Sequence, residues 1–219
     1  MTLILDEIYN SRNWKLFNQE QADLIKAKHR VQIRFQEISK VFALTSPCIQ
    51  RSYSNFWSPL TLNYIKINVD AALNSSRSAL AVVAWNHLGK VLFVWGKVNQ
   101  LCSLLQAEAM ALLWAVHLAI QNRWYSVMYE GDSKICIDAL NYYDQTPNWS
   151  IDTIICNIHS FSSCFTSCSF GWVRRSSNSV ANVATRFAFN CLQPFCFFEG
   201  TLPPAIKAAC KGDTHFCFP

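Results

Sequence analysis

The chain has 219 residues, of which 51% are hydrophobic and 14% aromatic, which is enough for one domain of ordinary size with flanking segments. Its formal net charge of +5 is compatible with a nucleic-acid partner but does not require one. We expect no membrane span, because no run reaches roughly 18 consecutive apolar residues. We also expect no secretory signal, because the first apolar residues lack a basic leader and are interrupted by Asp6 and Glu7.

The 10 cysteines are expected to be reduced thiols, since a protein without a secretory signal has little use for a disulfide framework. Three pairs come near metal-ligand spacing, but none forms a CxxC arrangement, so a structural zinc site is not favoured: Cys164 with Cys168, Cys191 with Cys196, and His215 with Cys217. We expect a monomer in the nucleus or cytoplasm, not a secreted protein.

The first 61 residues are expected to form a helical connector and a linker. Residues 18–40 are polar and helix-prone, and no strand-like alternation occurs before about Tyr53. Basic side chains in this region could bind nucleic-acid phosphates or form an ordinary solvated helix face, and the second interpretation is favoured: Lys26, Lys28, His29, Arg30 and Arg34.

Residues 64–72 are predicted to form a strand with an acid near its end. Apolar and polar residues alternate there, which is typical of a strand with one buried and one polar face: Ile65, Ile67 and Val69 against Lys66, Asn68 and Asp70. Taken alone, Asp70 reads as a surface aspartate that ends a strand.

Two later segments also carry an acid near the end of an element. A buried helix is predicted over residues 104–121, with Glu108 in its first turn, where the helix dipole favours a negative charge. A short strand over 126–129 is followed by Asp132, which, like the next residue, could cap a helix that ends near Tyr142. An apolar domain has little reason to gather three carboxylates unless a cation neutralises them, and hard oxygen ligands suit magnesium or manganese.

The remaining elements suggest an α/β fold. We predict strands over 79–85, 90–98 and 169–173, and helices over 151–162 and 178–190. Three successive strands followed by helices that alternate with strands favour a mixed sheet covered by helices. The folded domain is placed at residues 62–190. The Phe-, Cys- and Pro-rich tail, 191–219, is expected to pack or to have no role, with no helix beyond 204–209.

The segments NVDAA, AEAMAL and EGDS occur in an order that resembles the ribonuclease H-like domain of plant retrotransposon-derived proteins, the reverse-transcriptase-associated type of the ribonuclease H superfamily. The turn at 86–92 and the segment 172–182 are similar to linking pieces of that family. The resemblance covers roughly 62–190. It implies a ribonuclease H-like fold, in which a five-stranded mixed sheet is flanked by helices and the first strand is central. The segment before the domain resembles the connector that, in related proteins, joins an upstream reverse-transcriptase segment to the ribonuclease H-like domain.

The resemblance further implies an endoribonuclease that hydrolyses the RNA strand of RNA–DNA hybrids with two Mg²⁺ or Mn²⁺ ions. Asp70 would bridge both ions, Glu108 and Asp132 would hold one, and Asn182 would hold the other. The family usually has an acid where Asn182 stands, so the second ion should bind more weakly.

Nucleic acid would be recognised without regard to base sequence, through phosphates and groove shape. Arg174, Arg175 and Asn178 are the candidate contacts, although the two arginines could equally be a solvated pair at the edge of a strand. The loop at 174–178 lacks the histidine that several ribonucleases H carry. The alternative is therefore a degenerate domain that binds nucleic acid or a protein partner without catalysis. Another nuclease or an integrase with the same superfamily fold is a further alternative.

Overall fold

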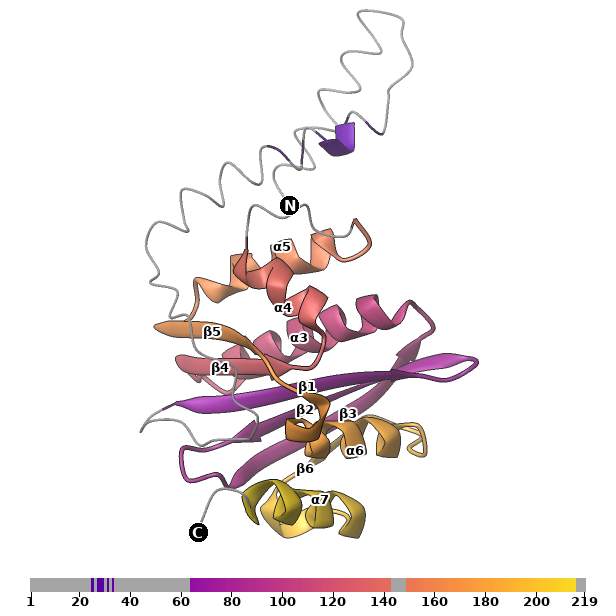
Figure 1. Ribbon diagram of the computed structural model, residues 1–219, viewed down its shortest axis with the longest axis vertical. Coiled ribbons are helices and arrows are strands. Elements are labelled where there is room, and N and C mark those ends of the chain that lie inside the picture. The colour runs from indigo at the N-terminus through magenta and orange to yellow at the C-terminus, as the bar shows by residue number, and fades with distance from the viewer. Residues whose placement is uncertain are drawn as a thin grey trace, which may run out of the picture. The chain divides into compact units, whose positions relative to one another are not determined.

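The computed structural model describes residues 64–142 and 149–215, together with residues 25, 27–29, 31 and 33 (Figure 1). The chain divides into two compact units, Met1–Pro47 and Cys48–Pro219, and nearly all described residues belong to the second. In the first unit the described residues are helical, and Lys28 and His29 are exposed. The other basic residues of the predicted connector lie outside the described residues, so its role as a phosphate-binding surface stays a prediction.

A six-stranded mixed sheet forms the centre of the second unit, in the order β5-β4-β1-β2-β3-β6. Strand β1 is central, pairing antiparallel with β2 and parallel with β4, as expected. The strand bounds are β1 Ile65–Leu73, β2 Arg77–Trp85, β3 Val91–Gln100, β4 Ser126–Gly131, β5 Ser167–Trp172 and β6 Phe195–Phe197.

The prediction of five strands is wrong by one, because the tail contributes β6. This strand pairs antiparallel with β3, with Phe195 opposite Gly96. A run of three residues is too short to show a periodic pattern, so this strand could not be predicted from the sequence. The tail then forms helix α7, Pro204–His215, which runs beyond the predicted end at Ala209 and buries Ile206 completely.

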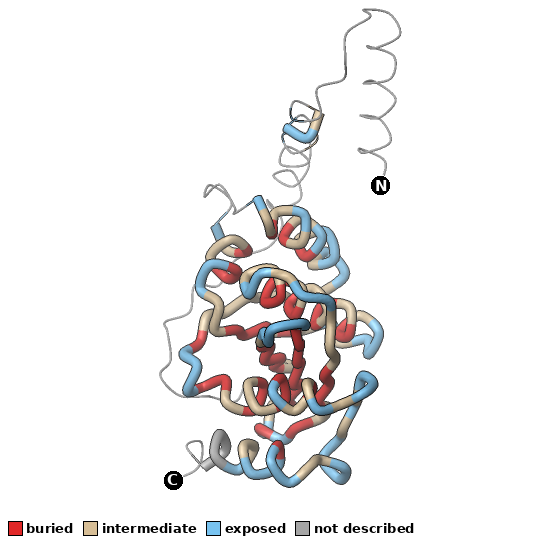
Figure 2. Tube along the Cα trace, turned by 90° about the vertical axis from the view of Figure 1, so that its right-hand side faces the viewer, coloured by how far each residue is buried: buried red, intermediate tan, exposed pale blue. Residues whose placement is uncertain are grey.

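Helices cover both faces of the sheet (Figure 1). On one face lie α3 Leu104–Gln121, α4 Lys134–Asn141 and α5 Asp152–Ser162, and on the other lie α6 Ser179–Ala188 and α7. Each face has its own hydrophobic cluster, and Figure 2 shows the buried residues concentrated between the layers.

The predicted polar face of β1 is therefore buried rather than exposed. Because α6 packs against β1, β2 and β3, the side chains expected at the surface lie inside the protein. Lys66 pairs with Glu130 at 3.0 Å, and Asn68 donates to the other oxygen of Glu130 at 3.1 Å. These contacts compensate part of the cost of burying polar groups. Alternation identified the strand correctly, but it could not show that a second helical layer would cover it.

Helix α3 has the predicted bounds, but the prediction that Glu108 lies in its first turn is wrong. Ser103 caps it, and Gln106 completes a capping box, so the helix begins at Leu104 and Glu108 lies beyond the first turn. By length and composition this helix could cross a membrane, and in the described part of the chain it is the one helix that could. Its apolar residues instead pack against β1, β2 and α5, as expected of a core helix.

Replacing Gly96 with Ala is expected to lower the free energy of unfolding by about 1–3 kcal/mol. A Cβ at this position would overlap the ring of Phe195. The Phe195 ring stacks on the ring of Phe197, with 4.6 Å between the ring centroids, and makes an edge contact with the ring of Phe187. It therefore cannot move away from residue 96 without disrupting this aromatic cluster. Urea unfolding measures the effect. Gly200→Ala is the matched control, because the atom nearest to its new Cβ is 3.6 Å away. Equal stability of the two variants would contradict the packing argument.

Candidate functional site

Asp70 lies where β1 leaves its parallel neighbour. The last residue of β1 paired with β4 is Val69, which stands opposite Gly131. Strand β1 itself continues to Leu73, because β2 still pairs with it there. Asp70 thus sits at the carboxyl end of β4 and next to the chain that leaves it, a common position for the sites of open α/β sheets.

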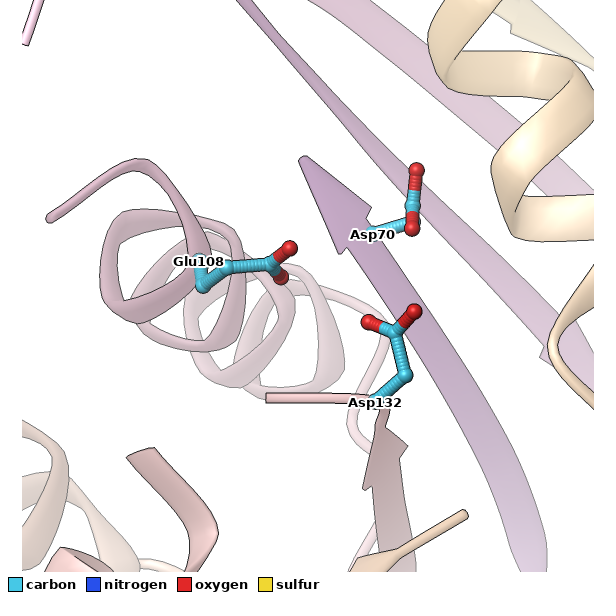
Figure 3. Close-up of side chains that lie close together, drawn as sticks. All are labelled: Asp70, Glu108 and Asp132. Carbon is cyan, nitrogen blue, oxygen red and sulfur yellow. The ribbon is translucent and has the colours of Figure 1, made fainter. Parts of the chain in front are cut away.

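The structure brings the three predicted acids together. Glu108 comes from α3, and Asp132 comes from the residue directly after β4. One carboxylate oxygen from each of Asp70, Glu108 and Asp132 lies within 4.8 Å of the others. Figure 3 shows Glu108 and Asp132 extending towards Asp70 from the helix and from the end of the strand. We call this group the carboxylate cluster.

Burial makes the cluster electrostatically unfavourable without a cation. Burial is the main cause that raises the pKa of Glu108 to about 9, and the charges of Asp70 and Asp132 raise it further. Burial also raises the pKa of Asp70 to about 6 and the pKa of Asp132 above its usual value. Carboxylates this close cannot all ionise at low cost unless positive charge neutralises them.

Helix α6 supplies the other neighbours of Asp70. The polar side chains of Thr185 and Asn182 lower the pKa of Asp70, so both lie beside the cluster. The hydroxyl of Thr185 itself donates to the carbonyl oxygen of Ala181 at 2.8 Å. Thr185 was not predicted. It follows Asn182 by three residues and so shares its helical face, and that spacing is the one signal that could have found it. One oxygen of Asp70, Oδ2, is buried and has no hydrogen-bond partner.

Asn178 does not lie at the surface, where its predicted contact with nucleic acid would place it. Its side chain is 1% exposed, and its Nδ2 donates to the carbonyl oxygen of Val69 at 2.8 Å. This hydrogen bond ties the start of α6 to the residue before Asp70. The position of Asn178 therefore corrects the expectation of a nucleic-acid contact and indicates a role in holding β1.

Asp132 is held through its backbone and approached by a cation. Trp172 Nε1 donates to the carbonyl oxygen of Asp132 at 3.0 Å. Arg175 Nη1 lies 3.9 Å from Asp132 Oδ2, and the Arg175 side chain is 64% exposed. Arg174 is exposed as well. Both arginines are thus accessible, and Arg175 reaches the carboxylate cluster.

The donor set fits a hard divalent cation. Three carboxylates converge from three different elements, and the unpaired Asp70 Oδ2 would gain a partner if a cation bound there. Oxygen-only ligands of this kind suit Mg²⁺ or Mn²⁺ better than a thiol-binding metal.

The comparisons with known proteins concern the family and the fold. A family model described as reverse transcriptase-like matches residues 68–188, more than half of the 219 residues. A search of curated proteins found no match to the chain.

Solved structures of RNase H proteins resemble the second unit. Ribonuclease H1 from Halobacterium salinarum has 19% identity and a TM-score of 0.55, with 58% of this chain and 98% of that chain covered. The N-terminal RNase H domain of a Mycobacterium tuberculosis protein has 16% identity and a TM-score of 0.54, with 58% and 94% covered. LC11-RNase H1, isolated from compost and solved in complex with an RNA/DNA hybrid, has 16% identity and a TM-score of 0.53, with 57% and 96% covered. At these identities the likeness concerns the fold, and it confirms the expected RNase H-like α/β architecture.

Proposed function

The chain belongs to the reverse transcriptase-like family, and from this premise we propose that it is an endoribonuclease that hydrolyses the RNA strand of RNA–DNA hybrids. The observation that carries the proposal is the carboxylate cluster, in which three largely buried acids come within 4.8 Å of one another. A purely structural core would gain nothing from this arrangement. A plant retrotransposon-derived origin, a monomeric state and a nuclear or cytoplasmic location are part of the same proposal.

Two divalent ions, Mg²⁺ or Mn²⁺, are proposed at the cluster. Asp70 is assigned to both, Glu108 and Asp132 to one, and Asn182 to the other. When bound, the ions supply the positive charge that activates a water molecule and stabilises the departing 3′ oxygen. Asn182 offers a neutral carbonyl oxygen, so the second ion is expected to bind more weakly than it would to an acid.

The chain's other residues orient these acids and contact the substrate. Asn178 holds the backbone of β1 beside Asp70, and Trp172 holds the backbone of Asp132. Arg174 and Arg175 are exposed and are assigned to phosphate oxygens of the hybrid. Such contacts carry no base information, so cleavage should not depend on sequence.

The proposal is tested by incubating the purified protein with a labelled RNA–DNA hybrid, first with Mg²⁺ and then with Mn²⁺. Cleavage of the RNA strand that stops when EDTA is added is the expected result. Single-stranded RNA and a DNA duplex serve as substrate controls and should stay intact. A protein that binds the hybrid but leaves it uncut with either ion would contradict the catalytic proposal.

A second candidate function is favoured by Asn182. Its neutral side chain stands beside Asp70, where an added acid would strengthen a second metal site. A domain with one weakened site could keep its affinity for nucleic acid or for a protein partner and lose catalysis. Binding without cleavage in the experiment above is the result that this second function predicts.

The metal-free protein is expected to lose stability as the pH rises above 7, and excess magnesium should reverse the loss. The pKa of Glu108 is about 9 in the folded protein against 4.5 ordinarily, so the folded state binds more protons between these values and its stability falls as they are released. Burial lowers the pKa of His159 from 6.5 to about 4, so His159 has the opposite effect on stability between these two values. Above pH 7 it is neutral in both the folded and the unfolded state, and the effect of Glu108 remains.

Thermal unfolding at several pH values with EDTA or with magnesium chloride measures this effect. Magnesium should raise the melting temperature more at pH 9 than at pH 7, because deprotonated carboxylates bind it better. Glu108→Gln keeps the shape of the side chain but cannot ionise. It should therefore weaken both the pH dependence of the melting temperature and the pH dependence of the stabilisation by magnesium. A wild-type profile that matches the Glu108→Gln profile would contradict the assignment.

A further inference from the structure

Arg175 combines a fixed backbone with an exposed side chain at the edge of the carboxylate cluster. It begins a short 3-10 helix, Arg175–Ser177, whose last amide, that of Ser177, donates to the carbonyl oxygen of Arg174 at 2.8 Å. The amide of Asn178 donates to the carbonyl oxygen of Arg175 at 3.1 Å, and the side chain of Asn178 is bonded to β1. The backbone of Arg175 is therefore tied to the strand that carries Asp70, while its side chain is 64% exposed and has room to move.

The charge of Arg175 acts on all three acids. Its guanidinium Nη1 lies 3.9 Å from Asp132 Oδ2. In addition, its positive charge lowers the pKa of Asp70, of Glu108 and of Asp132. Among the described basic residues, Arg175 is the one that forms an ion pair with a carboxylate of the cluster. It thus supplies part of the positive charge that the carboxylates need.

We propose that Arg175 is an internal counter-cation that competes with divalent ions for the carboxylate cluster and so limits their affinity. This inference rests on the proposed function, because it takes the cluster to be the metal site. A guanidinium at Asp132 cancels part of the negative charge that attracts an ion and repels the ion itself. Because the side chain is exposed, it can leave Asp132 for a phosphate oxygen, which is a good bidentate partner for arginine.

A consequence is that bound nucleic acid raises the affinity of the cluster for the metal, and bound metal raises the affinity for nucleic acid, through Arg175. When a phosphate of the nucleic acid pairs with the guanidinium of Arg175, the competing positive charge leaves the cluster. The divalent ion then binds to a more negative site. In the absence of nucleic acid, the arginine keeps the buried acids partly neutralised. The same side chain would therefore favour metal binding mainly when a substrate backbone is present, with a coupling that must be reciprocal.

The adjacent Arg174 is a matched control. Arg174 carries the same charge and is exposed, but among the described residues the ion pair with the cluster is made by Arg175 and not by Arg174. Arg175→Gln and Arg174→Gln therefore change the net charge equally and differ in the contact with Asp132. Arg175→Lys keeps the charge but loses the planar group. Because both positions are exposed, all three variants should fold, which circular dichroism checks.

The experiment is titration of each metal-free protein with MgCl₂ and MnCl₂ by isothermal calorimetry, with no nucleic acid present. Arg175→Gln should bind the ions about three- to tenfold more tightly than wild type at low salt, Arg174→Gln should match wild type, and Arg175→Lys should lie between them. The gain should shrink at high salt, because the repulsion is screened.

Equal or weaker binding by Arg175→Gln relative to Arg174→Gln would overturn the inference and leave the proposed metal site intact. An absence of binding by all four proteins would instead remove the metal site, and with it both the proposed function and this inference. The two failures are therefore distinguishable in one set of titrations.

Discussion

Asp70→Asn is expected to abolish metal-dependent cleavage of an RNA–DNA hybrid. Loss of a partner that merely supports a metal ligand typically costs 10–100-fold, so loss of a ligand assigned to both ions should cost more than about 100-fold. The substitution keeps the shape of the side chain and removes the charge. Rates of hybrid cleavage and the affinity for Mn²⁺ should fall together.

Asp138→Asn is the control for this loss. Asp138 lies on α4 and pairs with Lys134 at 2.7 Å, so its replacement removes a carboxylate that is not part of the cluster. Cleavage by Asp138→Asn should stay close to wild type. Retained cleavage by Asp70→Asn would show that the reaction, if present, is centred elsewhere.

Asn182→Asp is expected to have the opposite effect and to strengthen both metal binding and cleavage by about tenfold or more. The added carboxylate would lie beside Asp70, where the present amide contributes no charge. In the absence of metal the extra negative charge should raise the pKa of Asp70 further and lower the melting temperature. A divalent ion should restore that temperature, so the stability and the activity measurements check each other.

A control variant is needed to separate the effect of the added negative charge from the effect of its position beside Asp70. Asn190→Asp adds the same charge at an exposed residue past the end of α6 and should leave metal affinity unchanged. If the wild type proves inactive and Asn182→Asp cleaves, the protein has lost its second metal site and kept the rest of its catalytic apparatus. Identical metal affinities in the two variants would contradict the placement of Asn182 at that site.

Local patterns predicted those parts of the fold that depend on neighbours in the sequence. Alternation located β1, and the turn at Gly89, whose φ is positive, joined β2 to β3 as expected. The helix formers around Glu108 predicted α3 with its observed bounds. The three acids were found because each stands near the end of such an element, although the family pattern was needed to bring them together.

What the sequence could not predict depends on contacts between distant residues. Asn178 and Val69 are 109 residues apart, and no local pattern indicates that an asparagine before a helix will be buried against a strand. Similarly, Lys66 reads as a surface residue until Glu130, on a neighbouring strand, is known to lie 3.0 Å away. Burial of polar groups is decided by the layers that meet, which is why these residues were misplaced.

The pairing of β6 with β3 has a consequence for self-association. Strand β3 has ten residues, and without β6 it would be the outermost strand of the sheet on that side. A long apolar edge is a template on which other chains can add strands and aggregate. The three residues of β6 cover the middle of that edge, from Val94 to Gly96, with a strand too short to recruit another, and α7 packs on the apolar cluster of that face. The aromatic tail thus protects the solubility of the domain, and the domain is best handled with its tail attached.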